Sequence, residues 1–183
     1  MAIKTISMSS GNDQYNEGWH TIEISKAEYG TWEGRDGEPV TYLDMWFKDY
    51  PENFNMRVFE ARNKETNEEF KIANIFKRAN AGIVSVLKDP TGKRPVIQYD
   101  DEASGLVGKS INAYFIKEEG KGGKTYAKAF EDIAPVAQKG DHLSYSQKDV
   151  DGIKNSVENR VKKVLAKKLE TQGSRVSADD IPF

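Results

Sequence analysis

The stretch "VTYLDMWFK" (40–48) alternates between two sets of side chains. One set is Leu43, Met45 and Phe47, and the other set is Tyr42, Asp44 and Trp46. Successive side chains of a strand point to opposite faces of the sheet, so this spacing predicts a strand. The purely apolar set must be buried against other parts of the chain. The first expectation is therefore a mainly β fold.

Similar patterns predict further strands. A long strand runs from Trp19 to Trp32, and its apolar parity changes after Ile24, which predicts a β-bulge there. Shorter alternating stretches lie at 55–60, 95–99, 109–117 and 125–133, and a glycine-rich hairpin tip at 118–124 separates the last two. Apolar residues recur at three- and four-residue spacing over 68–80, which predicts a helix that Gly82 ends.

The predicted order is three strands, a helix, and two or more strands. This is the element order of an OB-fold, a small five-stranded Greek-key barrel. An SH3-like barrel and an α+β roll have similar element counts. We expect an OB-fold-like domain over 18–138, after a flexible lead-in at 1–17.

The last third of the chain has a different pattern. A helix is predicted over 146–170, within a segment 144–170, and it carries seven Lys/Arg against four Asp/Glu. Its apolar stripe consists of Val150, Ile153, Val157, Val161, Val164 and Leu165, with Leu169 close to it. We favour packing of this stripe on the barrel or on a second copy of the chain over direct contact with DNA. Residues 171–183 have no periodicity and are expected to form a disordered acidic tail.

Composition excludes several classes of protein. The chain has no cysteine, so disulfides and cysteine-based zinc sites are absent, which suits a reducing compartment. No signal peptide and no membrane-spanning run is visible, and the formal net charge is −2. The two histidines, His20 and His142, belong to no nucleophile–base set, and the acids of "YDDE" (99–102) are best interpreted as a solvated turn. We therefore expect neither an enzyme nor a bound cofactor or metal.

Aromatic and basic side chains alternate with the predicted core positions. The candidates for binding a single nucleic-acid strand are Trp32, Tyr42, Trp46, Arg57, Phe59, Tyr126 and Lys128, with Lys121 and Lys124 at the hairpin tip. Bases stack on aromatic rings, and Lys or Arg neutralises the phosphates. Each ring could instead fill the barrel interior. Asp44 would repel phosphate unless it caps a turn or pairs with a cation.

The chain ends in "DDIPF", which places two acids beside two apolar anchors. The candidate partner-binding residues are Asp179, Asp180, Ile181, Pro182 and Phe183. Proline stiffens the peptide and lowers the entropy lost on binding. This chemistry suits a basic-rimmed apolar pocket that captures a terminal carboxylate.

"DDIPF" resembles the C-terminal tip of bacterial single-stranded DNA-binding proteins. "GWHTIEISKAEYG" and "YLDMWFKDYPENFNMRVFE" also look like segments of the single-stranded DNA-binding proteins of tailed bacteriophages. The resemblance implies an OB-fold that coats single strands and a tip that docks replication, recombination and repair enzymes. Bacterial members have a Gly/Pro/Gln-rich linker where this chain has a charged helix, which favours a monomer or homodimer over their tetramer.

These observations lead to one expected function. The chain is expected to bind single-stranded DNA without sequence preference in the cytoplasm of a phage-infected bacterium. The tip is expected to recruit a polymerase, a helicase or primase, or a nuclease. A recombination mediator or annealing protein, and a protein-binding adaptor barrel without DNA affinity, remain alternatives, and a nuclease is a more distant one.

Overall fold

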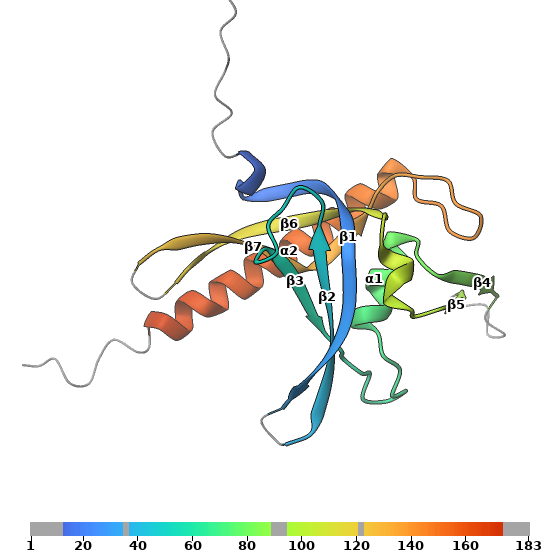
Figure 1. Ribbon diagram of the computed structural model, residues 1–183, viewed down its shortest axis with the longest axis horizontal. Coiled ribbons are helices and arrows are strands. Elements are labelled where there is room, and N and C mark those ends of the chain that lie inside the picture. Colours follow the sequence, from blue (N-terminus) through green and yellow to red (C-terminus); the bar gives the residue numbers. More distant parts are fainter. Residues whose placement is uncertain (1–12, 35–36, 89–94, 121–122, 174–183) are drawn as a thin grey trace, which may run out of the picture.

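A five-stranded antiparallel sheet organises the protein (Figure 1). The computed structural model describes residues 13–34, 37–88, 95–120 and 123–173. The sheet has the order β3-β2-β1-β6-β7. Its strands are β1 (Gly18–Glu33), β2 (Pro39–Phe47), β3 (Asn55–Phe59), β6 (Ser110–Glu119) and β7 (Thr125–Pro135). The expected mainly β fold is confirmed.

Strand β1 belongs to both halves of the sheet. Its first part, Gly18 to Glu23, pairs with β6, and its second part, from Ile24 onward, pairs with β2. The register shifts between Ile24 and Lys26, where the change of apolar parity predicts a bulge. A bulge bends and twists the strand, which lets one strand turn from one half of the sheet into the other.

The closed five-stranded barrel is not formed. The edge strands β3 and β7 approach one another, but no strand pairing joins them among the described residues. Strand β3 has only five residues, from Asn55 to Phe59, so it offers a short edge for pairing. The sheet curls toward closure and stays open between these two strands.

The core lies on the concave side of the sheet. Leu43, Met45 and Phe47 are buried there as the alternation predicts. Helix α1 (Lys71–Ala79) covers the core with Ile72, Ile75 and Phe76. The carboxylate of Glu69 accepts hydrogen bonds from the backbone N–H groups of Lys71, Ile72 and Ala73 at 2.8 Å, which satisfies the start of this helix. Tyr15, in the 3-10 turn Asp13–Tyr15, packs edge-on against Phe54.

The predicted helix over 68–80 is shorter than expected. It ends at Asn80, whose left-handed backbone (φ 51°) caps it before Gly82. The next residues form β4 (Ile83–Leu87), which pairs with β5 (Val96–Tyr99) in a separate two-stranded sheet. This hairpin projects from the opposite side of the body to the β6–β7 hairpin (Figure 1). A second short 3-10 turn, Ala103–Leu106, precedes β6.

Helix α2 (Gln147–Gly173) packs on the convex side of β6 and β7. Ser146 and Asp149 form a capping box: Asp149 N–H donates to the Ser146 hydroxyl, and Ser146 N–H donates to the Asp149 carboxylate. The buried stripe residues Val157 and Val161 contact Ile116 and Phe130 of the sheet. Of the two partners expected for this stripe, the barrel or a second copy of the chain, the structure shows the sheet of the same chain, while Val164 and Leu169 at the end of the stripe are exposed. No helix among the described residues combines the length and apolar character that crossing a membrane requires.

A buried ion cluster holds α2 against α1 and β7. Asp132 on β7 has a side chain only 10% exposed, and Arg78 of α1 and Arg160 of α2 both pair with it. Arg78 also donates to the carbonyl of Ile133 at 2.7 Å. Burial raises the pKa of Asp132, and the two guanidinium groups oppose that effect. Removing this carboxylate would leave two cations without their shared partner.

We predict that Asp132→Ala lowers the free energy of unfolding by about 3–5 kcal/mol, because it leaves the guanidinium of Arg78, whose side chain is 15% exposed, without its carboxylate partner. The neighbouring Glu131→Ala is the matched control. Glu131 is half exposed and pairs with Lys71 at 2.8 Å, so its loss should cost less than about 1 kcal/mol. Urea unfolding followed by circular dichroism measures both. Equal costs for the two variants would contradict the role given to the cluster.

Candidate functional site

The convex side of β1, β2 and β3 carries an aromatic and basic surface, here called the outer face. Strand pairing sets Lys26 opposite Trp46, Gly30 opposite Tyr42, and Trp32 opposite Val40. Pairing of β2 with β3 sets Tyr42 opposite Phe59 and Asp44 opposite Arg57. The outer face therefore consists of Lys26, Trp32, Tyr42, Asp44, Trp46, Arg57 and Phe59. These residues lie on the side away from Leu43, Met45 and Met56, so the predicted division of faces is confirmed.

Tyr42 lies at the centre of the outer face. The guanidinium of Arg57 stacks on its ring at 3.9 Å from the centroid, and Phe59 contacts it edge-on at 5.7 Å. On its other side the ring lies against the backbone of Gly30, where a Cβ atom would be 2.3 Å from the ring carbon Cζ. Only glycine leaves this space. The ring is thus fixed between Gly30 and Arg57.

Asp44 lies beneath Arg57. Its carboxylate accepts hydrogen bonds from Nε at 2.8 Å and from Nη2 at 2.6 Å, a bidentate pair that raises the pKa of Arg57. The Asp44 side chain is 9% exposed, and the Arg57 side chain is 38% exposed. Two of the five guanidinium N–H groups are used here, and the other three are available. Asp44 pairs with a cation, one of the two roles in which it would not repel phosphate.

Trp46 and Trp32 differ in accessibility. Trp46 is half-buried, donates from its indole N–H to the carbonyl of Glu52 at 2.9 Å, and has the Lys26 ammonium 4.6 Å from its ring centroid. Lys26 is itself paired with Glu28 at 2.9 Å. Trp32 is 59% exposed, near the end of the β1–β2 hairpin. Its ring is the most accessible of the predicted aromatic residues.

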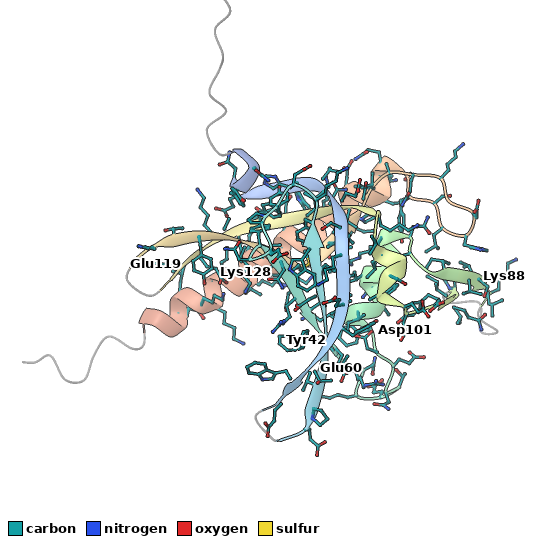
Figure 2. All side chains as sticks on the ribbon, in the orientation of Figure 1. Tyr42, Glu60, Lys88, Asp101, Glu119 and Lys128 are labelled. Atoms are coloured by element: carbon teal, nitrogen blue, oxygen red, sulfur yellow. The ribbon has the colours of Figure 1, made fainter. Side chains whose placement is uncertain are left out.

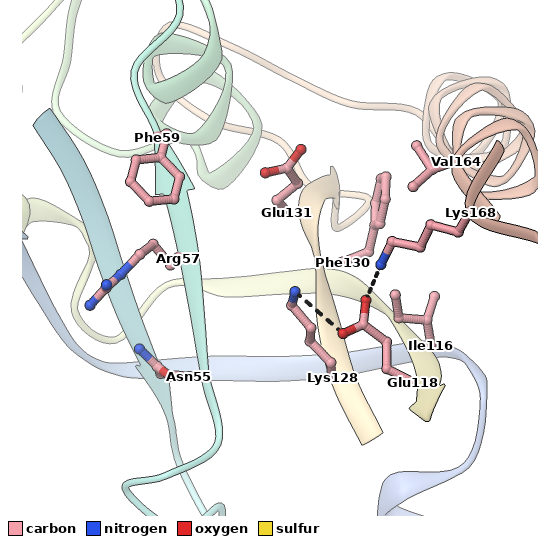
Figure 3. Close-up of a pocket in the computed structure, with 10 residues that line it drawn as sticks. All are labelled: Asn55, Arg57, Phe59, Ile116, Glu118, Lys128, Phe130, Glu131, Val164 and Lys168. Carbon is pink, nitrogen blue, oxygen red and sulfur yellow. Dashed lines mark hydrogen bonds and ion pairs between the residues drawn. The ribbon is translucent and has the colours of Figure 1, made fainter. Parts of the chain in front are cut away.

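A cavity of about 600 Å³, here called the groove, lies between β3, β6, β7 and α2 (Figure 3). Its lining residues are Asn55, Arg57, Phe59, Ile116, Glu118, Lys128, Phe130, Glu131, Val164 and Lys168. It occupies the place where β3 and β7 fail to pair. Arg57 and Phe59 belong to both the outer face and the groove, so the two surfaces are continuous.

Glu118 is bound by two lysines in the groove. Lys128 of β7 lies 3.7 Å from one carboxylate oxygen, and Lys168 of α2 pairs with the other (Figure 3). Tyr126 donates to the same carboxylate at 3.4 Å. The hydrogen bond from Lys168 holds the pKa of Glu118 below its usual range, although burial opposes that shift. The Glu118 side chain is 16% exposed and both lysine side chains are about half exposed.

The predicted site residues fall into three groups. Arg57, Phe59 and Lys128 meet in the groove, and Tyr42, Trp46 and Trp32 lie beside them on the outer face. Figure 2 shows Tyr42 on the β1–β2 hairpin and Lys128 on the β6–β7 hairpin. Tyr126 is half exposed and lines a separate hollow with Lys117, and Lys124 is exposed near the hairpin tip. Lys121 and the tail residues 179–183 lie outside the described residues.

Sequence reasoning missed Lys26, Glu118 and Lys168. Glu118 was assigned to a flexible tip, yet it continues the alternation of β6, two positions after Ile116. Lys168 follows Val164 by four residues, so it lies on the same side of α2 as part of the apolar stripe. Lys26 faces Trp46 only because of the register that follows the bulge. The first two had a signal in the spacing, and the third required the strand pairing.

Other chemistry has little support in the described part of the chain. No group of three or more His, Asp or Glu side chains there could hold a metal ion. His20 stacks on Phe115 at 4.2 Å and bonds to the carbonyl of Asn16 at 2.7 Å, which is a packing role. The chain matches no known protein-family model. A search of curated proteins likewise finds no significant match.

We predict that Gly30→Ala displaces the Tyr42 ring and lowers the free energy of unfolding by about 1–3 kcal/mol, because overpacked positions force neighbours to move. Gly152→Ala is the control. Gly152 is exposed on α2, and apart from its chain neighbours and the adjacent backbone of the helix no atom lies within 4 Å of an added Cβ, so alanine there should raise stability by roughly 0.5–1 kcal/mol. Urea unfolding reports both changes. A Gly30→Ala protein with the free energy of unfolding of the wild type would show that the Tyr42 ring is not fixed.

Proposed function

We propose that this chain binds single-stranded DNA without sequence preference and acts as a binding protein, not an enzyme. It would do so in the cytoplasm of a phage-infected bacterium during DNA replication, recombination and repair. The observation that carries the proposal is the outer face, where Arg57 stacks on Tyr42 beside the accessible ring of Trp32. Each base stacked on a ring contributes about 1–3 kcal/mol, and any base has a face to stack.

The cations of this surface support the same function. Arg57, Lys128 and Lys168 are each anchored by a carboxylate whose side chain is at most 16% exposed, while their own side chains are 38–53% exposed. These three cations therefore point outward with their own acids beneath them, while two exposed acids of the same surface, Glu28 and Glu131, are paired with Lys26 and Lys71. An anionic backbone could track along the outer face into the groove, with phosphates meeting cations and bases meeting rings.

The strand order supports an OB-fold as the framework. In an OB-fold the barrel is partly open, and the face of strands 2 and 3 with two flanking hairpin loops binds oligonucleotides. Here β2 and β3 carry most of the outer face, and the sheet stays open between β3 and β7. The flanking loops would be those between β1 and β2 and between β6 and β7.

The tail would add recruitment to binding. "DDIPF" (179–183) resembles the tip by which bacterial single-stranded DNA-binding proteins dock replication and recombination enzymes. Its two apolar anchors, Ile181 and Phe183, and its two acids, Asp179 and Asp180, fit a basic-rimmed apolar pocket on such a partner. The partner proteins would be a polymerase, a helicase or primase, or a nuclease.

A salt titration with oligo-dT tests the proposal directly. Fluorescence anisotropy should show tight binding to oligo-dT in dilute buffer, weaker binding as salt rises, and weaker binding still to a duplex of equal length. Trp32→Ala should weaken oligo-dT binding roughly 5- to 150-fold, the equivalent of about 1–3 kcal/mol for one stacked base.

Val84→Ala is the matched control for Trp32→Ala. Val84 is 60% exposed, as Trp32 is, but it lies on the β4–β5 hairpin away from the outer face. Its oligo-dT affinity should equal that of the wild type. A wild-type protein that ignores oligo-dT in dilute buffer would end the proposal, and an unaffected Trp32→Ala would remove Trp32 from the binding surface.

Deletion of residues 179–183 tests the tail. The tail is a polyanion, so it should compete weakly with DNA for the cationic surface, and bound DNA should release it for partners. The truncated protein should then bind oligo-dT more tightly at low salt, with the difference vanishing as salt rises. The control keeps the length and replaces both acids, Asp179→Asn with Asp180→Asn. Unchanged affinity at low salt would rule out the competition and leave recruitment to be judged by partner binding.

A further inference from the structure

We propose that Lys128 and Lys168 form a clamp for one phosphate of the bound single strand, so that helix α2 is part of the DNA-binding surface. This inference rests on the proposed function and extends it. It assigns a specific phosphate site to the groove and gives α2 a role in binding, where packing alone was favoured from the sequence.

The position of Glu118 indicates the chemistry of the clamp. The ammonium groups of Lys128 and Lys168 pair with different oxygens of its one carboxylate (Figure 3). The two lysines are therefore spaced to hold an anion through two of its oxygens. A phosphodiester has two non-bridging oxygens that share one negative charge. Within the protein, Glu118 thus pairs with the two lysines as a bound phosphate would, which is here called its stand-in role.

The charge balance leaves room for a second anion. Two ammonium groups and one carboxylate give the cluster a net charge of +1, which one phosphodiester would neutralise. Each ammonium has three N–H groups; Lys168 donates one to Glu118, and Lys128 lies 3.7 Å from the carboxylate as an ion pair without a hydrogen bond. The side chains of Lys128 and Lys168 are 53% and 52% exposed, whereas that of Glu118 is 16% exposed. A phosphate can therefore approach the lysines from the solvent side while Glu118 stays beneath them.

The surroundings suit a nucleotide. The groove volume of about 600 Å³ lies within the roughly 300–1,000 Å³ typical of small-molecule sites. Phe59 and the partly exposed Val164 provide apolar surface for a base or a sugar. Arg57 lines the same groove from β3, with its guanidinium directed away from the clamp toward Asp44 and Tyr42 (Figure 3). A single DNA strand whose bases stack on the outer face would reach the clamp by passing Arg57.

The packing of α2 fixes the position of Lys168. Val157 and Val161 are buried against the sheet, and Arg160 is paired with the buried carboxylate of Asp132. Lys168 lies two helical turns beyond Val161 and faces β6. Since the helix is held before this point, the lysine stem extends over the groove instead of into open solvent.

Lys168→Ala tests the clamp against Lys162→Ala. Lys162 is exposed on the same helix and does not line the groove, so both variants lose one charge from α2. Each phosphate contact with a single strand contributes about 0.7 to the slope of log K against log salt. Lys168→Ala should lower that slope by about 0.7 and weaken oligo-dT binding roughly fivefold at 0.1 M salt. Lys162→Ala should leave the slope unchanged.

Glu118→Gln tests the stand-in role. Glutamine keeps the shape and removes the internal anion, so the phosphate no longer competes with a carboxylate. Oligo-dT affinity should rise at low salt. A fall in affinity for a variant with wild-type circular dichroism and thermal midpoint would overturn the stand-in role of Glu118 and with it the clamp.

Lysine acylation followed by mass spectrometry gives a readout that does not depend on variants. Bound oligo-dT should protect Lys128 and Lys168 from an amine-reactive ester and leave Lys162 as reactive as before. Equal modification of Lys168 with and without oligo-dT overturns the clamp. If the wild type binds oligo-dT and Trp32→Ala weakens it while Lys168→Ala matches Lys162→Ala, the clamp is wrong and the proposed function stands. If the wild type does not bind oligo-dT, both the clamp and the proposed function are wrong.

Discussion

The bulge in β1 between Ile24 and Lys26 is the constraint on which the surface depends. Side chains of a strand alternate between faces, so a shift of one residue moves every later side chain to the other side of the sheet. Before the bulge β1 pairs with β6, and after it β1 pairs with β2. The shift places Lys26 beside Trp46 and Gly30 beneath Tyr42. The same bulge therefore determines which side chains of β1 face the core and which lie on the outer face.

Carboxylates that are buried (Asp44) or partly buried (Glu118) organise the cations of the surface. Asp44 holds Arg57, and Glu118 holds Lys128 and Lys168, in each case with the acid less exposed than the cation. An exposed ion pair contributes little to stability, since the side chains lose entropy when they are held in one geometry. Here that ordering has another consequence. The bidentate pair with Asp44 positions Arg57 in advance, which lowers the entropy that a ligand must overcome on binding, whereas the charge of Glu118 competes with a phosphate for its two lysines.

The sequence predicted the parts of the fold that follow from local periodicity. The alternation in 40–48 assigned Leu43 and Trp46 to opposite faces correctly, and the parity change located the bulge after Ile24. The sequence did not predict strand β4. Its first residue, Ile83, continues the three- and four-residue spacing of the preceding helix, which conceals the start of a strand. The left-handed Asn80 ends the helix, and no apolar pattern can show that. Closure of the sheet depends on the approach of β3 and β7, which strand patterns do not encode.

The face on which each site residue lies within its strand was predictable from the sequence. The contacts between elements far apart in the chain were not. Tyr42 alternates with Leu43 on β2, and Arg57 and Phe59 alternate with Met56 and Val58 on β3, so their common face follows from alternation once the two strands pair. The groove needs α2 docked on β7, and that docking depends on Asp132, a carboxylate with no sequence signal that distinguishes it from Glu131. Because α2 supplies one wall of the groove, the buried ion cluster acts on the site at a distance. The pair of Arg160 with Asp132 is one of the contacts, beside the buried Val157 and Val161, that hold the helix carrying Lys168, so the packing of the helix and the electrostatics of the groove are coupled.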